Sequence, residues 1–189
     1  MGCLRFIQRT WKRFLNADFQ NLAEHHLRVI WIALILAKHE GVEDTGKVIK
    51  MALVHDIPES RAGDVDYLSR QYVERNEALG LEDMLDGTAL QEEFIALWHE
   101  YEKRECIEAK IVKDADNLDV DFELQEEAAR GNIRIGQKKE EARHYVFENK
   151  LYTETAKKMW QQMKEVDPHD FWYNSDRNRL NSGDWKSTK

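Results

Sequence analysis

The sequence predicts an all-α protein of one domain, and three observations support this. Its 189 residues include only nine Gly and two Pro, so residues that favour turns are scarce. The helix-forming residues Leu, Ala, Glu, Lys and Gln dominate its long segments. A chain of this length buries a sizeable core without disulfides, so we expect one helical domain over residues 1–173, with its core at about 10–130, followed by a polar tail at 174–189.

Apolar residues recur at helical spacing along most of this domain. The spacing predicts helices over 1–20, 22–40, 47–56, 68–79, 88–104, 107–129 and 137–166. Gly41 and Gly80 are expected to end the second and fourth of these, while Asp44 or Thr45 caps the third and Thr88 opens a capping box for the fifth. The stretch 58–70 is expected to be a loop, and the amphipathic C-terminal helix to pack against the domain or a second subunit.

The charge of the chain limits its partners. The formal net charge is -8 and the isoelectric point is about 5.4, so the surface as a whole repels a polyphosphate backbone and long nucleic acid is excluded. A small phosphate ester is compatible with this charge, because a metal ion and a few basic side chains reverse its sign locally. The candidate cations are Arg5, Arg9, Lys12, Arg13 and Arg61.

Cysteine usage and apolar run length indicate the compartment. Cys3 and Cys106 lie far apart with no CxxC spacing, so neither a disulfide scaffold nor a thiolate metal site is expected. The longest apolar stretch, 29–37, is too short to span a bilayer, which needs about 20 residues. We therefore expect a cytoplasmic protein with no membrane contact.

The pair His55-Asp56 is the first candidate for chemistry. Pro58 disfavours helical geometry at Ile57, so a helix that arrives through 48–54 should end near Asp56. A helix C-terminus carries partial negative charge, and a carboxylate beside an imidazole at that end suits a divalent cation.

Two further stretches add ligand candidates to this pair. Asp116 lies at the edge of the apolar stripe of its helix, where a buried carboxylate needs a partner and a metal ion is a sufficient one. His25 and His26 each share a helix face with apolar residues, and periodicity alone does not choose between them. Asp114, Asp119 and Asp121 are expected to form a solvated acidic face, with Asp119 able to reach the rim of the site.

The ordered set of these residues resembles the HD-domain superfamily of metal-dependent phosphohydrolases, and most closely its bacterial 5'-deoxynucleotidase type. That superfamily has the signature H…HD…D on helices. The stretches that carry the resemblance are AEHH at 23–26, HDIPE at 55–59, GD at 63–64 and EAKIVKDAD at 108–116. The resemblance implies an HD-domain helical bundle with an extra amphipathic C-terminal helix, and it selects His25 rather than His26.

The resemblance also implies a cofactor and its ligands. One divalent metal ion, out of Mn, Co, Fe, Zn, Ni and Mg, is expected on a mixed nitrogen and oxygen ligand set. Binuclear relatives insert two further His between the HD pair and the last Asp, whereas this chain has only His99 there, which favours a single ion. The implied metal ligands are His25, His55, Asp56 and Asp116.

The same resemblance assigns residues around the metal. Glu59 and Asp64 stand at spacings that look like those of the family's proton-handling acids, although composition alone would make each an exposed loop carboxylate. In the nucleotidase-type relatives an Arg-Trp pair precedes the first metal His; here Trp11 is present but Thr10 takes the place of the Arg, which leaves Arg9 or Arg13 to substitute. The implied substrate-binding residues are Trp11, Arg13 and Arg61.

These observations predict a metal-dependent phosphohydrolase. The leading hypothesis is a phosphomonoesterase that releases phosphate from (deoxy)nucleoside 5'-monophosphates by attack of a water activated by the metal. The alternative is a catalytically silent HD module that binds a nucleotide or a partner protein, which Thr10 in place of the family Arg favours. The resemblance and the amphipathic C-terminal helix also suggest a homodimer.

Overall fold

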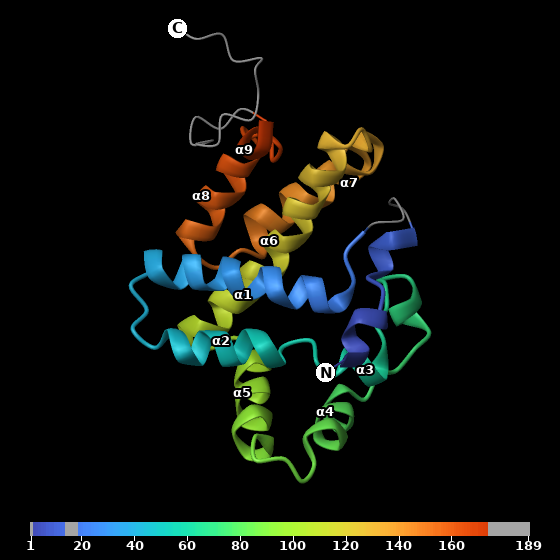
Figure 1. The fold of residues 1–189 in the computed structure, drawn as a ribbon, viewed down its shortest axis with the longest axis vertical. Coiled ribbons are helices and arrows are strands. Elements are labelled where there is room, and N and C mark those ends of the chain that lie inside the picture. Colours follow the sequence, from blue (N-terminus) through green and yellow to red (C-terminus); the bar gives the residue numbers. More distant parts are fainter. Residues whose placement is uncertain (1, 14–18, 174–189) are drawn as a thin grey trace, which may run out of the picture.

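The computed structural model describes residues 2–13 and 19–173, and the regular elements within them are helices joined by turns and loops (Figure 1). An isolated antiparallel bridge joins Gln8 and Asn21, and the described residues form no β-strand. This confirms the all-α prediction. No helix in these ranges is both long and apolar enough to cross a membrane. The 3-10 helices (η) and α-helices are η1 Gly2–Phe6, η2 Thr10–Arg13, α1 Leu22–His39, α2 Thr45–Val54, α3 Glu59–Ala62, η3 Ser69–Gln71, α4 Glu77–Leu85, α5 Gln91–Lys103, α6 Ile107–Ala129, α7 Ile133–Asn149, α8 Glu154–Met163 and α9 Asp170–Tyr173.

The helices α1, α2 and α6 form the centre of the fold. The helices α1 and α2 lie side by side, and α6 crosses behind them, in contact with both (Figure 1). Each buries an apolar face in the shared core, including Val29, Leu36, Met51, Ile111 and Leu118, all at 0% exposure. Because these three helices hold one another on several sides, side chains that they direct into the junction have fixed positions.

The end of α1 and the cap of α2 follow the sequence prediction, and α1 also begins with a capping box. Asn21 accepts hydrogen bonds from the backbone N–H groups of Ala23 and Glu24, while the Glu24 carboxylate accepts one from the Asn21 N–H. Asp44 caps α2 by accepting from the Lys47 N–H. Gly41 follows α1 with a φ of +71°, as a left-handed helix end requires.

The N-terminal segment differs from the helix predicted over 1–20. It forms two short 3-10 helices separated by an extended passage, in which the Ile7 carbonyl accepts a hydrogen bond from the Leu22 N–H at 2.9 Å. The segment is therefore fixed by pairing with the start of α1 rather than by its own apolar stripe. Phe14, a member of that expected stripe, and the tail 174–189 lie outside the described residues.

The region 58–91 also departs from prediction. Part of the expected loop forms the short helix α3, and the predicted helix over 68–79 is wrong, since α4 begins after Asn76 and continues through Gly80. A Cβ at Gly80 would lie 3.3 Å from Arg61 Cβ and 3.5 Å from the Pro58 carbonyl oxygen, so glycine here lets α3 and α4 approach closely. The expected capping box at Thr88 does not form, because its hydroxyl donates to the Leu85 carbonyl and α5 begins at Gln91.

The C-terminal helix predicted over 137–166 is two helices, α7 and α8. The carboxylate of Asp114 accepts hydrogen bonds from the backbone N–H groups of Tyr152 and Thr153, at 2.7 and 2.8 Å, and from the Thr153 hydroxyl at 2.7 Å. That hydroxyl in turn accepts from the Ala156 N–H and caps α8. Asp114, expected on a solvated face, is thus fully buried and fixes the turn between the two helices.

We expect Asp114→Asn to destabilise the protein by about 2–4 kcal/mol, because the amide presents donors to backbone groups that themselves donate. Burial raises the pKa of Asp114 to about 6, so urea unfolding at pH 8 compares the ionised wild-type side chain with the variant. Glu92→Gln, at an exposed position of α5, is the control and should change the free energy of unfolding by less than about 0.5 kcal/mol. Equal stability of the two variants would contradict this role of Asp114.

Candidate metal centre and substrate pocket

Four side chains from three places in the sequence meet where α1, α2 and α6 join. His25 lies in the first turns of α1, His55 and Asp56 follow the end of α2, and Asp116 lies on α6. One ligand atom from each lies within 4.8 Å of all the others. The Nε2 atom of His25 is 3.3 Å from Oδ2 of Asp56, 3.5 Å from Oδ1 of Asp116 and 3.3 Å from Nε2 of His55. The fold therefore brings together all four residues expected to hold the metal.

The donor set of this cluster suits a divalent metal ion. Ligand atoms about 2.0–2.2 Å from one ion lie roughly 3–3.5 Å apart, which matches the separations around His25 Nε2. Two imidazole nitrogens and two carboxylate oxygens suit Zn, Mn, Co, Fe or Ni. Both His side chains are fully buried, and Asp56 and Asp116 are 20% and 14% exposed, so the cluster opens to solvent on the carboxylate side. The site thus has room for a substrate oxygen beside its protein ligands.

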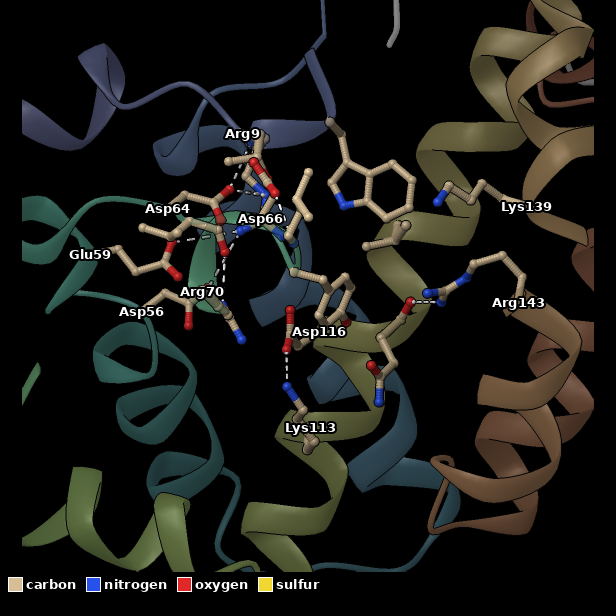
Figure 2. Close-up of a pocket in the computed structure, with 17 residues that line it drawn as sticks. Arg9, Asp56, Glu59, Asp64, Asp66, Arg70, Lys113, Asp116, Lys139 and Arg143 are labelled. Carbon is tan, nitrogen blue, oxygen red and sulfur yellow. Dashed lines mark hydrogen bonds and ion pairs between the residues drawn. The ribbon is translucent and has the colours of Figure 1, made fainter. Parts of the chain in front are cut away.

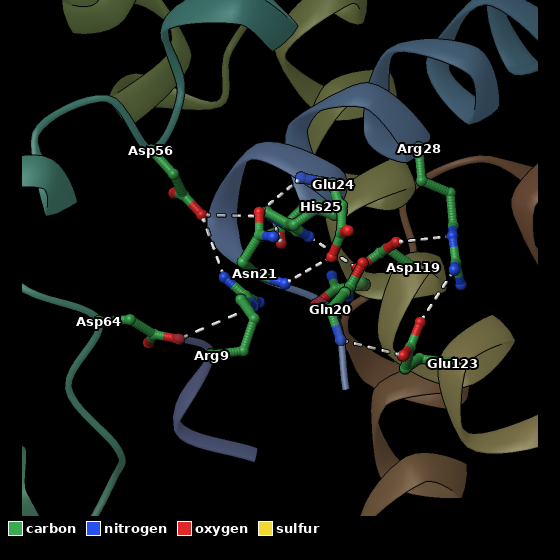
Figure 3. Close-up of polar contacts among 12 residues, drawn as sticks. Arg9, Gln20, Asn21, Glu24, His25, Arg28, Asp56, Asp64, Asp119 and Glu123 are labelled. Atoms are coloured by element: carbon green, nitrogen blue, oxygen red, sulfur yellow. Dashed lines mark hydrogen bonds and ion pairs between the residues drawn. The ribbon is translucent and has the colours of Figure 1, made fainter. Parts of the chain in front are cut away.

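Hydrogen bonds at the opposite ring nitrogens orient both imidazoles. Nδ1 of His25 donates to Oδ2 of Asp119 at 2.7 Å (Figure 3). Nδ1 of His55 donates to the Ala52 carbonyl oxygen at 2.7 Å. Because both acceptors lack a proton to give, each neutral ring carries its hydrogen on Nδ1 and presents the Nε2 lone pair to the cluster. The indole of Trp98 also donates to the His55 carbonyl oxygen, at 3.3 Å.

Asp119 belongs to a buried polar network instead of the solvated face expected from the sequence (Figure 3). Its Oδ2 atom also accepts from the Gln20 side-chain amide at 2.6 Å, and its Oδ1 atom lies 3.5 Å from Nε of Arg28. Arg28 extends the network to Glu123, at 2.9 Å. Burial and Arg9 lower the pKa of His25, but Asp119 and Asp56 outweigh them and raise it to about 9, so binding of a metal ion requires that the Nε2 proton leave.

The structure shows that His25 belongs to the ligand cluster and His26 does not, a choice that helix periodicity could not make. The His26 ring lies beside His55, with 4.7 Å between ring centroids, but His26 contributes no atom to the ligand cluster. Its buried Nε2 atom makes no hydrogen bond within the described residues. Burial and the neighbouring His55 lower the pKa of His26 well below its usual value, so this ring is neutral and packs beside the site.

The two carboxylates of the cluster are held ionised by neighbouring positive groups. Lys113, one turn before Asp116, contacts the Asp116 Oδ2 atom at 2.7 Å, which leaves Oδ1 directed at His25. Burial acts to raise the pKa of Asp116, yet Lys113 and the histidines lower it below its usual range. Burial also acts to raise the pKa of Asp56, but His55 and His25 outweigh it, and the pKa of Asp56 lies well below its usual value. Ionised carboxylates are the form that binds a metal ion.

Arg9 occupies the centre of a group of acids beside the cluster. Its Nη1 atom lies 3.6 Å from Oδ2 of Asp56, and its Nε atom lies 3.7 Å from Oδ2 of Asp64. The backbone N–H of Thr10 donates to the same Asp64 oxygen at 3.0 Å. The resemblance placed an arginine at the position of Thr10. In this chain the preceding residue, Arg9, brings a guanidinium to the site, and Thr10 contributes a backbone hydrogen bond to Asp64.

Glu59 faces the same group from α3. Its Oε1 atom lies 3.4 Å from Nη1 of Arg75, and its buried Oε2 atom makes no hydrogen bond among the residues described. Burial, Asp56 and Asp64 together raise the pKa of Glu59 to about 9. Glu59 and Asp64, both expected from sequence to handle protons, thus both lie beside the Arg9 guanidinium, at 4.0 and 3.7 Å.

A cavity of about 360 Å³ begins at this cluster and extends towards α7 (Figure 2). Asp56, Glu59, Asp64 and Asp116 line one end, and Lys139 and Arg143 of α7 line the other. Apolar side chains also line the cavity: Trp11, Val65, Tyr67, Leu68 and Val120. This volume falls within the range of about 300–1,000 Å³ typical of small-molecule sites.

Two of the three expected substrate-binding residues are not brought into this cavity. Trp11 lines it, as predicted. Arg61 lies on the far side of α3, where it lines a separate depression with Arg75 and Asp83. Arg13 does not line the cavity; its side chain is 64% exposed and pairs at 3.4 Å with Asp66, which does line it.

Helical spacing could have identified two further residues of the site, Lys113 and Asp119. Lys113 and Asp119 lie three residues before and three after Asp116, so one face of α6 carries all three. Gln20, Tyr67, Lys139 and Arg143 carried no such signal, because only the packing of α1, the loop after α3 and α7 around α6 brings them to the site.

The helical fold and the H…HD…D cluster define a metal-site protein of the HD-domain class, and the chain belongs to that family, since the HD domain model matches residues 1–167. The chain is 30% identical over 152 residues to the 5'-deoxynucleotidase HDDC2 of Dictyostelium discoideum, covering 71% of this chain and 80% of that one. It is 31% identical over 147 residues to a 5'-deoxynucleotidase of Pectobacterium atrosepticum, covering 70% and 72%. A conserved hypothetical protein from Pyrococcus furiosus has a similar structure, with a TM-score of 0.67 and 27% identity, over 87% of this chain and 95% of that one.

We expect Asp119→Asn to weaken metal binding by about 10–100-fold, because loss of the carboxylate partner loosens the orientation of His25 and lowers its basicity. Isothermal titration of the metal-stripped protein with Mn, Co or Zn measures this. Glu126→Gln removes another carboxylate of the same Arg28 network without touching either histidine, and should leave the affinity unchanged. Equal affinities for the Asp119→Asn variant and the wild type would show that Asp119 does not orient the ligand.

Proposed function

We propose that this protein is a metal-dependent phosphomonoesterase that releases phosphate from deoxynucleoside 5'-monophosphates. The observation that carries the proposal is the convergence of His25, His55, Asp56 and Asp116 at the end of a cavity that also presents Arg9. Membership of the HD-domain family and the relatives named 5'-deoxynucleotidases support the reaction and the substrate class.

The metal ion would be held by the two Nε2 atoms and by one oxygen each of Asp56 and Asp116. When bound, it supplies positive charge to the phosphoryl group and lowers the pKa of water enough for hydroxide to form at neutral pH. Asp119 and the Ala52 carbonyl oxygen keep the two imidazoles aimed at that point.

Arg9 and Lys113 are the residues of this chain that bind the phosphate. Both are cations that line the cavity next to a metal-ligating carboxylate, Arg9 beside Asp56 and Lys113 beside Asp116. A planar guanidinium and an ammonium on two sides of the ligand cluster bind phosphoryl oxygens and hold the ester in one orientation. The indole of Trp11, farther along the cavity, offers a face on which the base stacks.

Glu59 and Asp64 are the acids placed to move protons. Attack by water requires that a proton leave the nucleophile, and departure of the sugar oxygen requires that one be supplied. Both carboxylates line the cavity end that contains the ligand cluster, and Arg9 contacts both. Arg75 orients Glu59 from behind, and the Thr10 N–H orients Asp64, so each carboxylate keeps an oxygen available to the substrate.

The test of this function is phosphate release from a panel of ribo- and deoxyribonucleoside monophosphates, with metal-stripped protein resupplied with Mn, Co, Zn or Mg. We expect turnover that depends on the added metal and that falls by at least about 1,000-fold in His55→Ala and Asp116→Ala, since each change removes a ligand. His99→Ala, at an exposed histidine of α5 outside the cavity, serves as the matched control.

The same assay distinguishes the alternative, a catalytically silent HD module. That module would bind nucleotide and gain thermal stability from it while releasing no phosphate with any metal. Full activity of either ligand variant would also overturn the proposal. The homodimer, the cytoplasmic location and the identity of the metal stay predictions from the sequence.

A second variant pair tests which arginine replaces the missing one of the family motif. We expect Arg9→Lys to lower kcat/KM by about tenfold or more, because lysine cannot present the planar fork between Asp56 and Asp64. Arg13→Lys, whose side chain is exposed, should stay within about twofold of the wild type. A larger loss in Arg13→Lys than in Arg9→Lys would assign the phosphate to Arg13 instead.

A further inference from the structure

The basic side chains that line the substrate cavity differ in their hydrogen-bond and ion-pair partners. Arg9 pairs with Asp56 and Asp64, and Lys113 pairs with Asp116. The remaining three are Arg70, Lys139 and Arg143. Arg70 donates to the Val65 carbonyl oxygen, and Arg143 forms two hydrogen bonds to the Asp121 carboxylate, at 2.9 and 2.7 Å. Within the described chain, Lys139 has no carboxylate at ion-pair distance, so its charge is available to a ligand.

The position of Lys139 is fixed by the helix that carries it. Arg143 is the buried residue of α7, and it ties that helix to α6 through Asp121 and through the Asn117 carbonyl oxygen, at 2.8 Å. Lys139 lies four residues before Arg143, so both project from the same side of α7. Figure 2 shows the two side chains directed into the cavity from the side opposite Asp56 and Glu59.

The surroundings of Lys139 suit a flat aromatic ligand. Its Nζ atom lies over the Trp11 ring, 5.8 Å from the ring centre, and the cavity lining also includes the apolar side chains of Tyr67, Leu68 and Val120. A base that stacks on this face of the indole takes the place of the ammonium there, and the long lysine side chain then reaches the edge of the base. An ammonium has three donors and no acceptor, so it binds most favourably to a base edge that carries an acceptor oxygen.

We propose that Lys139 recognises the base of the substrate by donating a hydrogen bond to a carbonyl oxygen on the base edge. This rests on the proposed function, in which the phosphate lies at the ligand cluster and the base beside Trp11. Guanine, thymine and cytosine each carry a carbonyl oxygen, whereas adenine carries none and its ring-nitrogen acceptors N1 and N7 lie beside an amino group that itself donates. Lys139 is thus a specificity-determining residue that favours bases with a carbonyl oxygen over adenine, at the end of the cavity remote from the reacting phosphate.

The test is steady-state kinetics of Lys139→Met on four phosphate esters: the deoxyguanosine, thymidine and deoxyadenosine 5'-monophosphates and deoxyribose 5-phosphate, which has no base. We expect KM to rise about tenfold for the guanine and thymine nucleotides with kcat unchanged, the size of effect of one charge-assisted hydrogen bond. KM for the adenine nucleotide and for the sugar phosphate should not change. Lys138→Met, at the exposed neighbouring lysine, should leave all four substrates unaffected.

Other outcomes would overturn the proposal. An equal rise in KM for deoxyribose 5-phosphate would show that Lys139 acts on the phosphate, and an unchanged KM for every ester would show that it contacts no substrate. If the wild type released no phosphate at all, the proposed function would fail by itself. Titration calorimetry of the intact nucleotides would then decide the role of Lys139: weaker binding of the guanine nucleotide to Lys139→Met than to Lys138→Met supports it, and equal or undetectable binding refutes it.

Discussion

Three aspartates buried along α6 each form hydrogen bonds with a different neighbouring segment of the chain. The rest of the structure depends on these contacts. A buried carboxylate is stable only when charged or hydrogen-bonding groups surround it. Asp114 holds the turn before α8, Asp119 holds the His25 ring of α1, and Asp121 holds Arg143 of α7. Asp116 pairs with Lys113 and faces the metal centre. The same helix thus joins the core, the metal ligands and the substrate cavity.

This arrangement separates the two tasks of the site. At one end of the cavity, imidazoles and carboxylates converge and Arg9 partly neutralises the acids, as chemistry on a phosphate ester requires. The wall that extends away from this end is largely apolar, with Trp11 and Tyr67 suited to a base. The far end belongs to α7, a helix whose one buried residue is Arg143. Changes on α7 are therefore free to alter substrate choice without disturbing the metal ligands.

The departure of the sequence from the family pattern at Thr10 has a structural explanation. The guanidinium of Arg9 lies 3.6 Å from Oδ2 of Asp56, so it reaches the ligand cluster from one position before Thr10. In this chain the extended passage after η1 pairs with the start of α1 and directs Arg9 inward. The Thr10 N–H then anchors the following turn to Asp64. A shift of one residue in the motif thus preserves the charge at the site.

The sequence by itself determined the helical class and the bounds of α1 and α6, because helix periodicity and helix ends are local properties. It also identified the four residues of the ligand cluster, through their order along the chain and its resemblance to a family motif, since periodicity alone did not choose between His25 and His26. Only the tertiary structure decided that the helix predicted over 137–166 is two helices, since the break depends on Asp114, which lies 38 residues before Tyr152. It also decided that Arg61 lies outside the cavity and that Lys139 lines it. The environment of a charged side chain is set by elements distant in sequence, and periodicity within one helix contains no information about them.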